Sequence, residues 1–263
     1  YRNIYLNSLK FRFQSTSNEY TAKLIYELDK EKFDIIEVHN RPLVLLKLMN
    51  KINTRFIMYY HNDPLSMSGS KTISERNEII NKVDKLIFIS KWVKDRFFKG
   101  IDNKFLQKTE IIYHSVKKRK KTAKSNCIVF VGKLNYSKGY DIFKDAILKI
   151  LDEFPNWRAI SIGNESRRNI YISHKLHNEL GFLDHEKTLK ILDKSEIAVV
   201  PSRWEEPFGR VALEATASGC ATITSTTGGL SETNNYLINI KKINSKKLYK
   251  KIKLLIRNKN KRK

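Results

Sequence analysis

Cysteine is scarce in this sequence of 263 residues, and the two that occur, Cys127 and Cys220, lie far apart. Neither has a second thiol or a histidine at the spacing of zinc ligands, so the sequence offers neither a disulfide framework nor a zinc knuckle. We expect both to be small buried residues. A hydrophobic core must then hold the fold, and the chain is long enough for two domains.

Long hydrophobic runs are also absent. No stretch of roughly 18 or more uncharged apolar residues occurs, and the sequence, which begins at Tyr1, shows no charged and then apolar signal pattern. We therefore expect a soluble, cytoplasmic protein.

Acidic residues are few: 27 Asp and Glu stand against 51 Lys and Arg, which gives a formal net charge of +24. Such a charge attracts phosphates in nucleic acid, in anionic lipid or in a nucleotide substrate, and it does not choose among them. An AT-rich genome, which favours Lys, Asn and Ile codons, would produce the same excess without selection for charge. The excess is densest in residues 241–263, with twelve Lys or Arg and no acid, and in residues 117–121.

Short β-rich segments alternate with helical ones along the chain, which predicts an α/β fold. The expected strands are 34–40, 55–62, 85–90 and 110–115 in the first half, and 127–132, 157–163, 179–183, 197–202 and 220–226 in the second. The expected helices include 41–51, 74–82, 91–98 and 141–154, the last with apolar residues at a 3.6-residue spacing. This alternation is typical of doubly wound parallel sheets, which bind ligands at the carboxyl ends of their strands.

The polar, charged segment KKRKKTAKSN, residues 117–126, interrupts the alternation and is interpreted as an interdomain linker. We expect an N-terminal Rossmann-like domain at 1–120 and a C-terminal one at 121–263. The first is interpreted as truncated, and the chain as a gene fragment, because only one clear helix, 19–29, and a weak strand near 4–6 precede residue 34.

A helix predicted at 245–256 places apolar residues on one face and Lys and Arg on the other. It is either an ordinary packing helix with a solvated basic side or a site of peripheral contact with anionic membrane.

The segment PSRWEEPFGRVALEATASGC, residues 201–220, carries the strongest chemical signal. It follows an apolar strand, turns at Pro207 and enters a helix that runs from near Gly209 to Gly219. A helix N-terminus at the carboxyl edge of a parallel sheet presents unpaired N–H groups and a positive dipole end, which suit a diphosphate. Glu206 in the loop and Glu214 in the helix could bind hydroxyls on either side of that diphosphate.

Three further motifs stand in a fixed order around this segment: YYHN at 59–62, VGKLNYSKG at 131–139 and TGGLSE at 227–232. Together with EPFG, LEA and ASG, they make the sequence resemble family 4 of the retaining glycosyltransferases over nearly its whole length. The resemblance implies the two-domain GT-B fold, with the nucleoside diphosphate sugar bound by the C-terminal domain.

For the donor, the resemblance implies that Lys133 and Lys138 are the cations that hold the diphosphate. The family more often has Arg at the first position, so Lys133 would supply a point charge without the bidentate fork. Glu214 would bind the ribose hydroxyls, and Glu206 would bind hydroxyls of the transferred sugar. Gly139 would let the loop turn into the next helix.

Other site residues follow from the same resemblance. Phe208 and Gly209 would offer backbone N–H groups to the sugar, and Arg210 either lies by the phosphates or points outward. Gly228 and Gly229 match a glycine pair near the donor, although they could form an ordinary turn.

Two histidines end neighbouring strands of the first half. His61 matches the histidine of the family that faces the donor sugar, and His39 ends the strand before it. Ser90 is expected to be an N-cap. No role is transferred to His114 and Ser115, where the family usually has an Asn-Gly turn.

The sequence contains no Asp-x-Asp motif, no His/Asp/Glu cluster at metal-ligand spacing and no nucleophile beside a base. This suits an enzyme that stabilises its leaving group with cations and a helix dipole rather than with a metal. For retention, the resemblance implies a same-face substitution in which the departing phosphate oxygen helps to deprotonate the acceptor.

We therefore expect a metal-free sugar transfer to a glycan or lipid-linked acceptor in cell-surface glycan synthesis, such as that of lipopolysaccharide. No cofactor beyond the nucleoside diphosphate sugar is expected. One alternative is a nucleotide-sugar epimerase or hydrolase of the same fold. A basic nucleic-acid-binding protein is the other, although no recognition module for nucleic acid is present.

Overall fold

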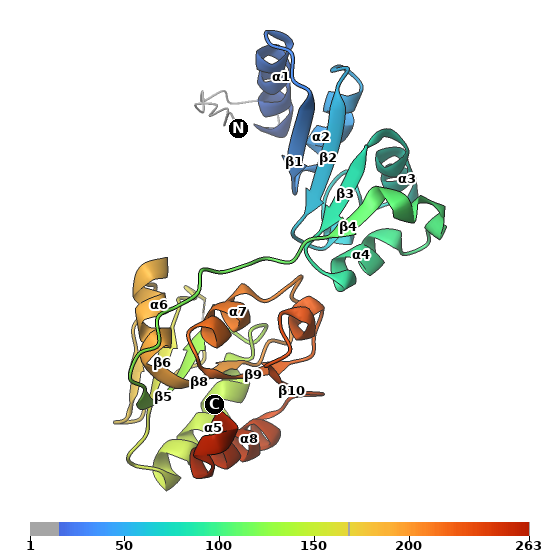
Figure 1. Ribbon diagram of the computed structural model, residues 1–263. Helices are drawn as coiled ribbons and strands as arrows, with labels where there is room; N and C mark the ends of the chain where they lie inside the picture. Colours follow the sequence, from blue (N-terminus) through green and yellow to red (C-terminus); the bar gives the residue numbers. More distant parts are fainter. Residues whose placement is uncertain (1–15, 168, 263) are drawn as a thin grey trace. The chain divides into compact units, whose positions relative to one another are not determined.

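The computed structural model describes residues 16–167 and 169–262, which form two compact units, residues 1–113 (unit 1) and 114–263 (unit 2) (Figure 1). The expected boundary after residue 120 lies within the segment that joins them. Each unit holds one parallel sheet with helices packed against it, which confirms the α/β fold with two parallel sheets. The weak strand expected near 4–6 lies outside the described residues.

Unit 1 contains a four-stranded sheet in the order β1-β2-β3-β4. Its elements are α1 (Thr16–Asp29), β1 (Ile35–His39), α2 (Pro42–Met49), β2 (Arg55–Tyr60), η1 (Pro64–Ser66), α3 (Ile73–Lys82), β3 (Lys85–Phe88), α4 (Lys91–Phe98), η2 (Asn103–Lys108) and β4 (Thr109–Ile111).

Sequence features within unit 1 explain where its helices begin and what they pack against. Ser90 caps α4 by accepting a hydrogen bond from the Val93 N–H at 3.1 Å, as expected. Phe97 and Phe98 on α4 then pack their rings against Phe88 of β3. The core of this unit is therefore partly aromatic.

Unit 2 contains a six-stranded sheet in the order β10-β9-β8-β5-β6-β7. Its elements are β5 (Ser125–Val131), α5 (Tyr140–Glu153), β6 (Arg158–Ile162), β7 (His177–Glu179), α6 (His185–Lys194), β8 (Ser195–Val200), α7 (Arg210–Ala217), β9 (Ala221–Ser225), η3 (Gly229–Glu232), β10 (Ile238–Ile240), α8 (Ser245–Arg257) and η4 (Lys259–Arg262).

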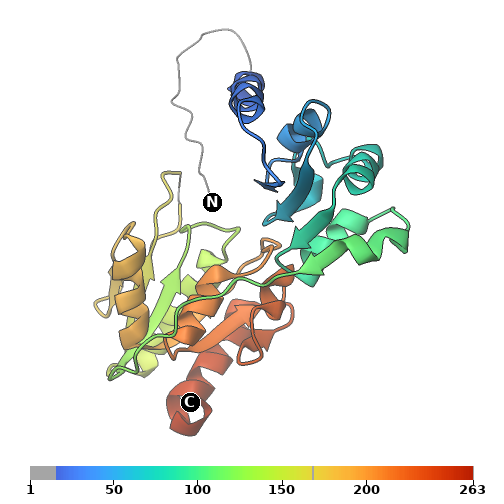
Figure 2. The same ribbon diagram turned by 45° about the horizontal axis from the view of Figure 1, so that its top comes forward.

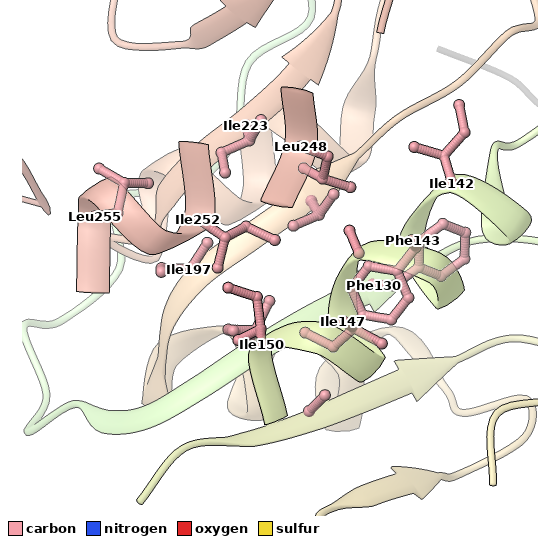
Figure 3. Close-up of a cluster of buried hydrophobic side chains, with 14 of the residues drawn as sticks. Phe130, Ile142, Phe143, Ile147, Ile150, Ile197, Ile223, Leu248, Ile252 and Leu255 are labelled. Carbon is pink, nitrogen blue, oxygen red and sulfur yellow. The ribbon is translucent and has the colours of Figure 1, made fainter. Parts of the chain in front are cut away.

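Helices cover both faces of this sheet, and the alternation of side chains along the strands explains why. Ile128 and Phe130 of β5 pack with α5 and α8 in the larger core cluster, part of which Figure 3 shows. Val129, which lies between them, packs on the opposite face with residues of α6 and α7. Strands buried on both faces are typical of doubly wound sheets.

The helix α8 packs its apolar face inside unit 2. Leu248, Ile252 and Leu255 are buried in the same cluster as α5, and Figure 2 shows α8 at the C-terminal end of the fold. Of the two interpretations of this helix, that of an ordinary packing helix accounts for its apolar residues. In the part of the chain that the structure describes, no helix combines the length and apolar character needed to cross a bilayer.

Two expected strands differ from the observed ones. The strand expected at 179–183 is β7, which covers His177–Glu179; after it Phe182 is 82% exposed, whereas Leu183 packs against the core cluster that contains Val129. The strand expected at 110–115 is β4, which ends at Ile111, and the side chains of Ile112 and Tyr113 after it are about half exposed. Cys127 and Cys220 are buried free thiols, as expected.

The expected linker is only partly free of regular structure, because Ser125 and Asn126 already belong to β5. Residues 112–124, the connecting segment, contain no helix or strand. They are nevertheless anchored on unit 2: Arg119 donates two hydrogen bonds to the Asp193 carboxylate, at 3.2 and 2.5 Å. Lys124 donates to the Ser218 carbonyl at 2.5 Å. The connecting segment is therefore fixed to the surface of unit 2 by side-chain hydrogen bonds and is not a fully solvated linker.

Candidate functional site in the second unit

The order of strands in unit 2 reverses beside β5, and this places two loops next to each other. The chain continues from β5 to β6 and β7 on one side, and then crosses to β8, β9 and β10 on the other. The loops that follow β5 (residues 132–139) and β8 (201–209) therefore meet at the carboxyl edge of the sheet. Such a switch point is where ligands bind in open α/β sheets.

Backbone contacts hold these two loops together. The N–H groups of Arg203 and Trp204 both donate to the Ser137 carbonyl at 2.9 Å. Gly139, at the N-cap of α5, has a φ of 70°, and a Cβ there would lie 2.1 Å from the Pro201 carbonyl oxygen. Only glycine fits both this conformation and this approach. The expected turn at Gly139 is confirmed.

A clamp around Arg203 also holds the two loops. Its guanidinium donates to both oxygens of Asp141 at 2.6 Å, the bidentate geometry that arginine favours. It also lies 3.7 Å from the centre of the Tyr136 ring and donates to the Tyr136 carbonyl at 2.8 Å. The pKa of Arg203 is raised, mainly by its hydrogen bond to Asp141.

Lys138 and Glu206 face each other across the loops. Nζ of Lys138 lies 2.6 Å from Oε1 of Glu206, and the two side chains are 29% and 18% exposed. The structure thus brings two of the expected site residues into direct contact. A cation and a carboxylate at one strand edge can bind the charged and the hydroxyl-bearing parts of a polar ligand.

Lys133 lies at the start of the same loop and is exposed. Asn135 shapes this loop, since its Oδ1 accepts a hydrogen bond from the Lys138 N–H at 3.1 Å and its Nδ2 donates to Glu165 at 3.0 Å. The pKa of Glu165 is lowered, chiefly by that hydrogen bond, with a smaller contribution from the charge of Lys133.

The glycine pair after β9 lies against Glu206. Gly228 forms a parallel bridge with Glu206, and the Gly229 N–H donates to the Glu206 carbonyl at 2.7 Å. A Cβ on Gly228 would lie 2.4 Å from that carbonyl oxygen. This glycine therefore permits the close packing of the 201–209 loop on the segment after β9.

The helix that follows the loop is α7, which begins at Arg210 and is followed by Gly219, close to the expected bounds. Gly209 is its N-cap, without a side-chain hydrogen bond. Phe208 is buried, and its ring lies edge-on to His114 at 5.5 Å between centroids. The pKa of His114 is lowered by burial and by the positive charge of Arg210.

Glu214 lies in α7 with only 8% of its side chain exposed, and it has an arginine and a histidine as neighbours. Its Oε1 lies 3.2 Å from Arg210 Nη2 and 3.0 Å from Nε2 of His185, the first residue of α6. The Arg210 side chain is 64% exposed and turns along the helix toward Glu214. Sequence reasoning missed His185, whose neighbours in the chain give no hint of this contact.

The remaining expected residue, His61, belongs to unit 1 and follows β2. Its Nε2 lies 2.9 Å from Nδ1 of His39, at the end of β1. Asn40, which has a positive φ of 53°, accepts a hydrogen bond from the His61 N–H at 2.8 Å. The two histidines are thus one cluster, and Asn40 was not predicted from the sequence.

Within residues 16–167 and 169–262, no group of three or more His, Cys, Asp and Glu is placed to hold a metal ion. At the switch point the described side chains bring together a cation, Lys138, and a carboxylate, Glu206.

Residues 114–263, more than half of the chain, match the family described as glycosyl transferases group 1. The chain belongs to this family. The matched region coincides with unit 2, which carries Lys133, Lys138, Glu206 and Glu214.

Curated relatives extend the similarity into unit 1. The chain is 25% identical over 246 residues to the putative glycosyltransferase YtcC of Bacillus subtilis, covering 81% of this chain and 60% of that protein. It is 27% identical over 254 residues to spore coat protein SA of the same organism, covering 81% and 66%. The chain thus spans less than two thirds of the length of either relative.

Solved structures share the fold at low identity. The crystal structure of Anabaena HepE in complex with UDP superposes with a TM-score of 0.77 at 18% identity, covering 92% of this chain and 74% of that one. The glycosyltransferase from Rickettsia africae superposes with a TM-score of 0.73 at 17% identity, covering 95% and 74%. Both similarities concern the fold.

Proposed function

We propose that the chain is the greater part of a retaining glycosyltransferase of family 4, whose unit 2 binds a nucleoside diphosphate sugar. The observation that carries the proposal is the Lys138–Glu206 pair, 2.6 Å apart, which joins the loop after β5 to the loop that leads into α7. Lys138 could bind a phosphate and Glu206 could bind sugar hydroxyls, and both lie beside the N-terminus of α7, where the helix dipole favours anions.

On binding, the diphosphate would replace Glu206 as the partner of the Lys138 ammonium group. Two phosphates compete well for a lysine, because they bring more negative charge than one carboxylate, and Lys133 in the same loop would add a second cation. The backbone N–H groups at the start of α7 point toward the same edge of the sheet. Glu206 would then be released to accept hydrogen bonds from the hydroxyls of the sugar.

Glu214 would bind the ribose. It is buried, and its carboxylate is already held by His185 and Arg210, so two ribose hydroxyls would meet an oriented acceptor. Structural neighbours were crystallised with UDP and with UDP-glucose, which supports uridine diphosphate sugars as the first donors to test.

The remaining predicted residues would complete the donor site. Phe208 and Gly209 would offer backbone N–H groups to the sugar, and Gly228 and Gly229 support the loop that carries Glu206. His61 would face the donor sugar from unit 1. Cations and the helix dipole would stabilise the leaving diphosphate without a metal, in a same-face substitution through an oxocarbenium-like state.

The acceptor that we propose is a glycan or a lipid-linked glycan of the cell surface, of the lipopolysaccharide type. The enzyme would act in the cytoplasm, with the basic side of α8 in peripheral contact with anionic lipid. Because the apolar face of α8 is buried against α5, this contact would be electrostatic and would weaken with salt.

Calorimetry with UDP and UDP-glucose, in buffer with excess EDTA, tests this proposal. We expect binding without added metal, and Lys138→Ala should weaken it by about 1.5–3 kcal/mol, the scale of a hydrogen bond to a charged group. Lys187→Ala is the matched control, because Lys187 is an exposed lysine paired with Asp184 in the same unit. Unchanged affinity in Lys138→Ala, or binding only with a divalent metal, would contradict the proposal.

A further inference from the structure

The two histidines of unit 1 form a hydrogen-bonded pair. In the β1–β2 register His39 stands opposite Tyr59, two residues before His61. Nδ1 of His39 and Nε2 of His61 are 2.9 Å apart, and the ring planes differ by only 10°. With centroids 5.2 Å apart, the rings meet edge to edge, which suits an N–H···N hydrogen bond.

The carboxylate of Glu37, on the other side of the His39 ring, favours one direction of that bond. In a hydrogen bond between two neutral imidazoles, one nitrogen carries the proton and the other accepts it. Nε2 of His39 lies 3.8 Å from a carboxylate oxygen of Glu37, which favours a proton on that nitrogen. Nδ1 of His39 is then the acceptor, and Nε2 of His61 must donate.

The surroundings hold this arrangement in place. The Tyr59 ring stacks on His39 at 4.3 Å between centroids, and its hydroxyl donates to the other oxygen of Glu37 at 3.4 Å. On the His61 side, Asn40 accepts the backbone N–H of His61, and the Asn40 N–H donates to the Tyr59 carbonyl at 3.0 Å. Both rings are thus tied to the ends of two paired strands.

We infer that His39 is a positioning residue that fixes His61 as the Nε2–H tautomer, so that the hydrogen-bond-accepting nitrogen of His61 is Nδ1. The functional meaning rests on the proposed function: His61 would accept a hydrogen bond from a sugar hydroxyl through Nδ1. Outer residues that orient a working histidine set both its tautomer and its ring plane.

Nitrogen-15 NMR of the labelled full chain at a pH where both rings are neutral tests the tautomer directly. We expect His61 to be protonated at Nε2, with its signals assigned by their loss in His61→Gln. His39→Phe keeps a ring on Tyr59 but removes the acceptor, and it should give a mixture of His61 tautomers. His39→Asn offers an amide oxygen in place of Nδ1 and should restore the Nε2–H form.

Kinetics with UDP-glucose give the second measurement. His39→Phe should lower kcat by roughly 10- to 100-fold with little change in the donor KM, and His39→Asn should recover part of that loss. His174→Phe, in unit 2, is the control and should change neither the His61 signals nor kcat. A wild-type His61 protonated at Nδ1, or an unchanged tautomer in His39→Phe, would overturn the inference.

The two proposals can fail separately. The NMR measurement needs no substrate, so a chain with the expected tautomers that binds no nucleotide sugar contradicts only the proposed function. A chain that binds and transfers sugar with His61 protonated at Nδ1 contradicts only the role of His39.

Discussion

The two units bring their candidate residues together by different physical means. In unit 1, His39 and His61 follow adjacent parallel strands, so the ladder of backbone hydrogen bonds between β1 and β2 is sufficient to place them side by side. In unit 2, Lys138, Glu206 and Gly228 lie on three loops that must be packed against one another.

This difference shows what each site depends on. Strand ends in register need only a continuous sheet, whereas loops need close backbone approach and paired charges to hold one geometry. The site in unit 2 should therefore be the more sensitive of the two to substitutions that touch no ligand. Three predictions test this contrast, beginning with the largest effect.

Gly139→Ala should cost about 2–5 kcal/mol of unfolding free energy. A left-handed backbone costs about 1–2 kcal/mol for alanine, and the added methyl group must also push away the Pro201 carbonyl, 2.1 Å distant, for about 1–3 kcal/mol more. Urea unfolding gives the stability, and calorimetry with UDP should show weaker binding, because the 201–209 loop has to move.

The matched control is Gly181→Ala. Gly181 has a similar φ of 66°, but a Cβ there would meet nothing within 4 Å. We expect the Gly181→Ala variant to be destabilised only by the conformational cost of a left-handed alanine, about 1–2 kcal/mol, and to bind UDP as tightly as the wild type. Equal losses in the two variants would show that the loops of unit 2 do not depend on this close approach.

Glu206→Gln and Glu214→Gln should separate the two ends of the donor, each at a cost of about 1.5–3 kcal/mol. Glu214→Gln should weaken both UDP and UDP-glucose, because the ribose is common to them. Glu206→Gln should leave the affinity for UDP unchanged and should lower kcat, because the loss of a sugar contact that strengthens in the transition state is seen in kcat.

Calorimetry with UDP and steady-state kinetics with UDP-glucose make this comparison, with circular dichroism as the check on folding. If the two variants lose affinity for UDP equally, the assignment of ribose to one glutamate and sugar to the other is wrong. The family membership would stand, because it rests on the match over residues 114–263.

Arg119→Met should release the connecting segment from unit 2 at a smaller cost, about 1–2 kcal/mol at neutral pH. The pKa of Asp193 lies below its ordinary value, mainly because Arg119 donates hydrogen bonds to its carboxylate. The Arg119–Asp193 pair therefore contributes its full stabilisation above the pKa that Asp193 has in the unfolded chain, near 4. This contribution is lost as the pH falls through the pKa of Asp193 in the folded state. The difference between wild type and variant should therefore shrink below about pH 4.

Lys187→Met is the control for this measurement. Lys187 also pairs with an aspartate, but the two side chains are 69% and 54% exposed, so its loss should leave the unfolding free energy nearly unchanged. A constant difference between wild type and Arg119→Met from pH 7 to pH 3 would rule out Asp193 as the source.

Sequence reasoning succeeded where local pattern and local structure agree. The cap at Ser90, the turn at Gly139 and the bounds of α7 all depend on a few neighbouring residues, and each was predicted. The placing of Lys138 and Glu206 at one donor site followed only from the family resemblance, and their direct contact, across 68 positions, was not predicted.

The contacts that were missed all join distant segments. His185 reaches Glu214 across 29 positions, Arg203 reaches Asp141 across 62, and Arg119 reaches Asp193 across 74. Charged residues are common in this sequence, so composition could not single out these pairs. Parallel sheets bring such segments together through crossovers, and the partners become visible only when the strand order is known.

The close approach of Gly139 to Pro201 also limits how this family can be recombined. The loop after β5 and the loop after β8 are joined by backbone hydrogen bonds, by this close approach and by the Arg203 clamp, so the shape of each depends on the other. An engineer who exchanges donor specificity between relatives should transplant both loops as a single cassette, and substitutions in the two should show strong epistasis. We therefore expect the two loops to vary together, although the Arg203–Asp141 contact beside them spans 62 positions of the chain.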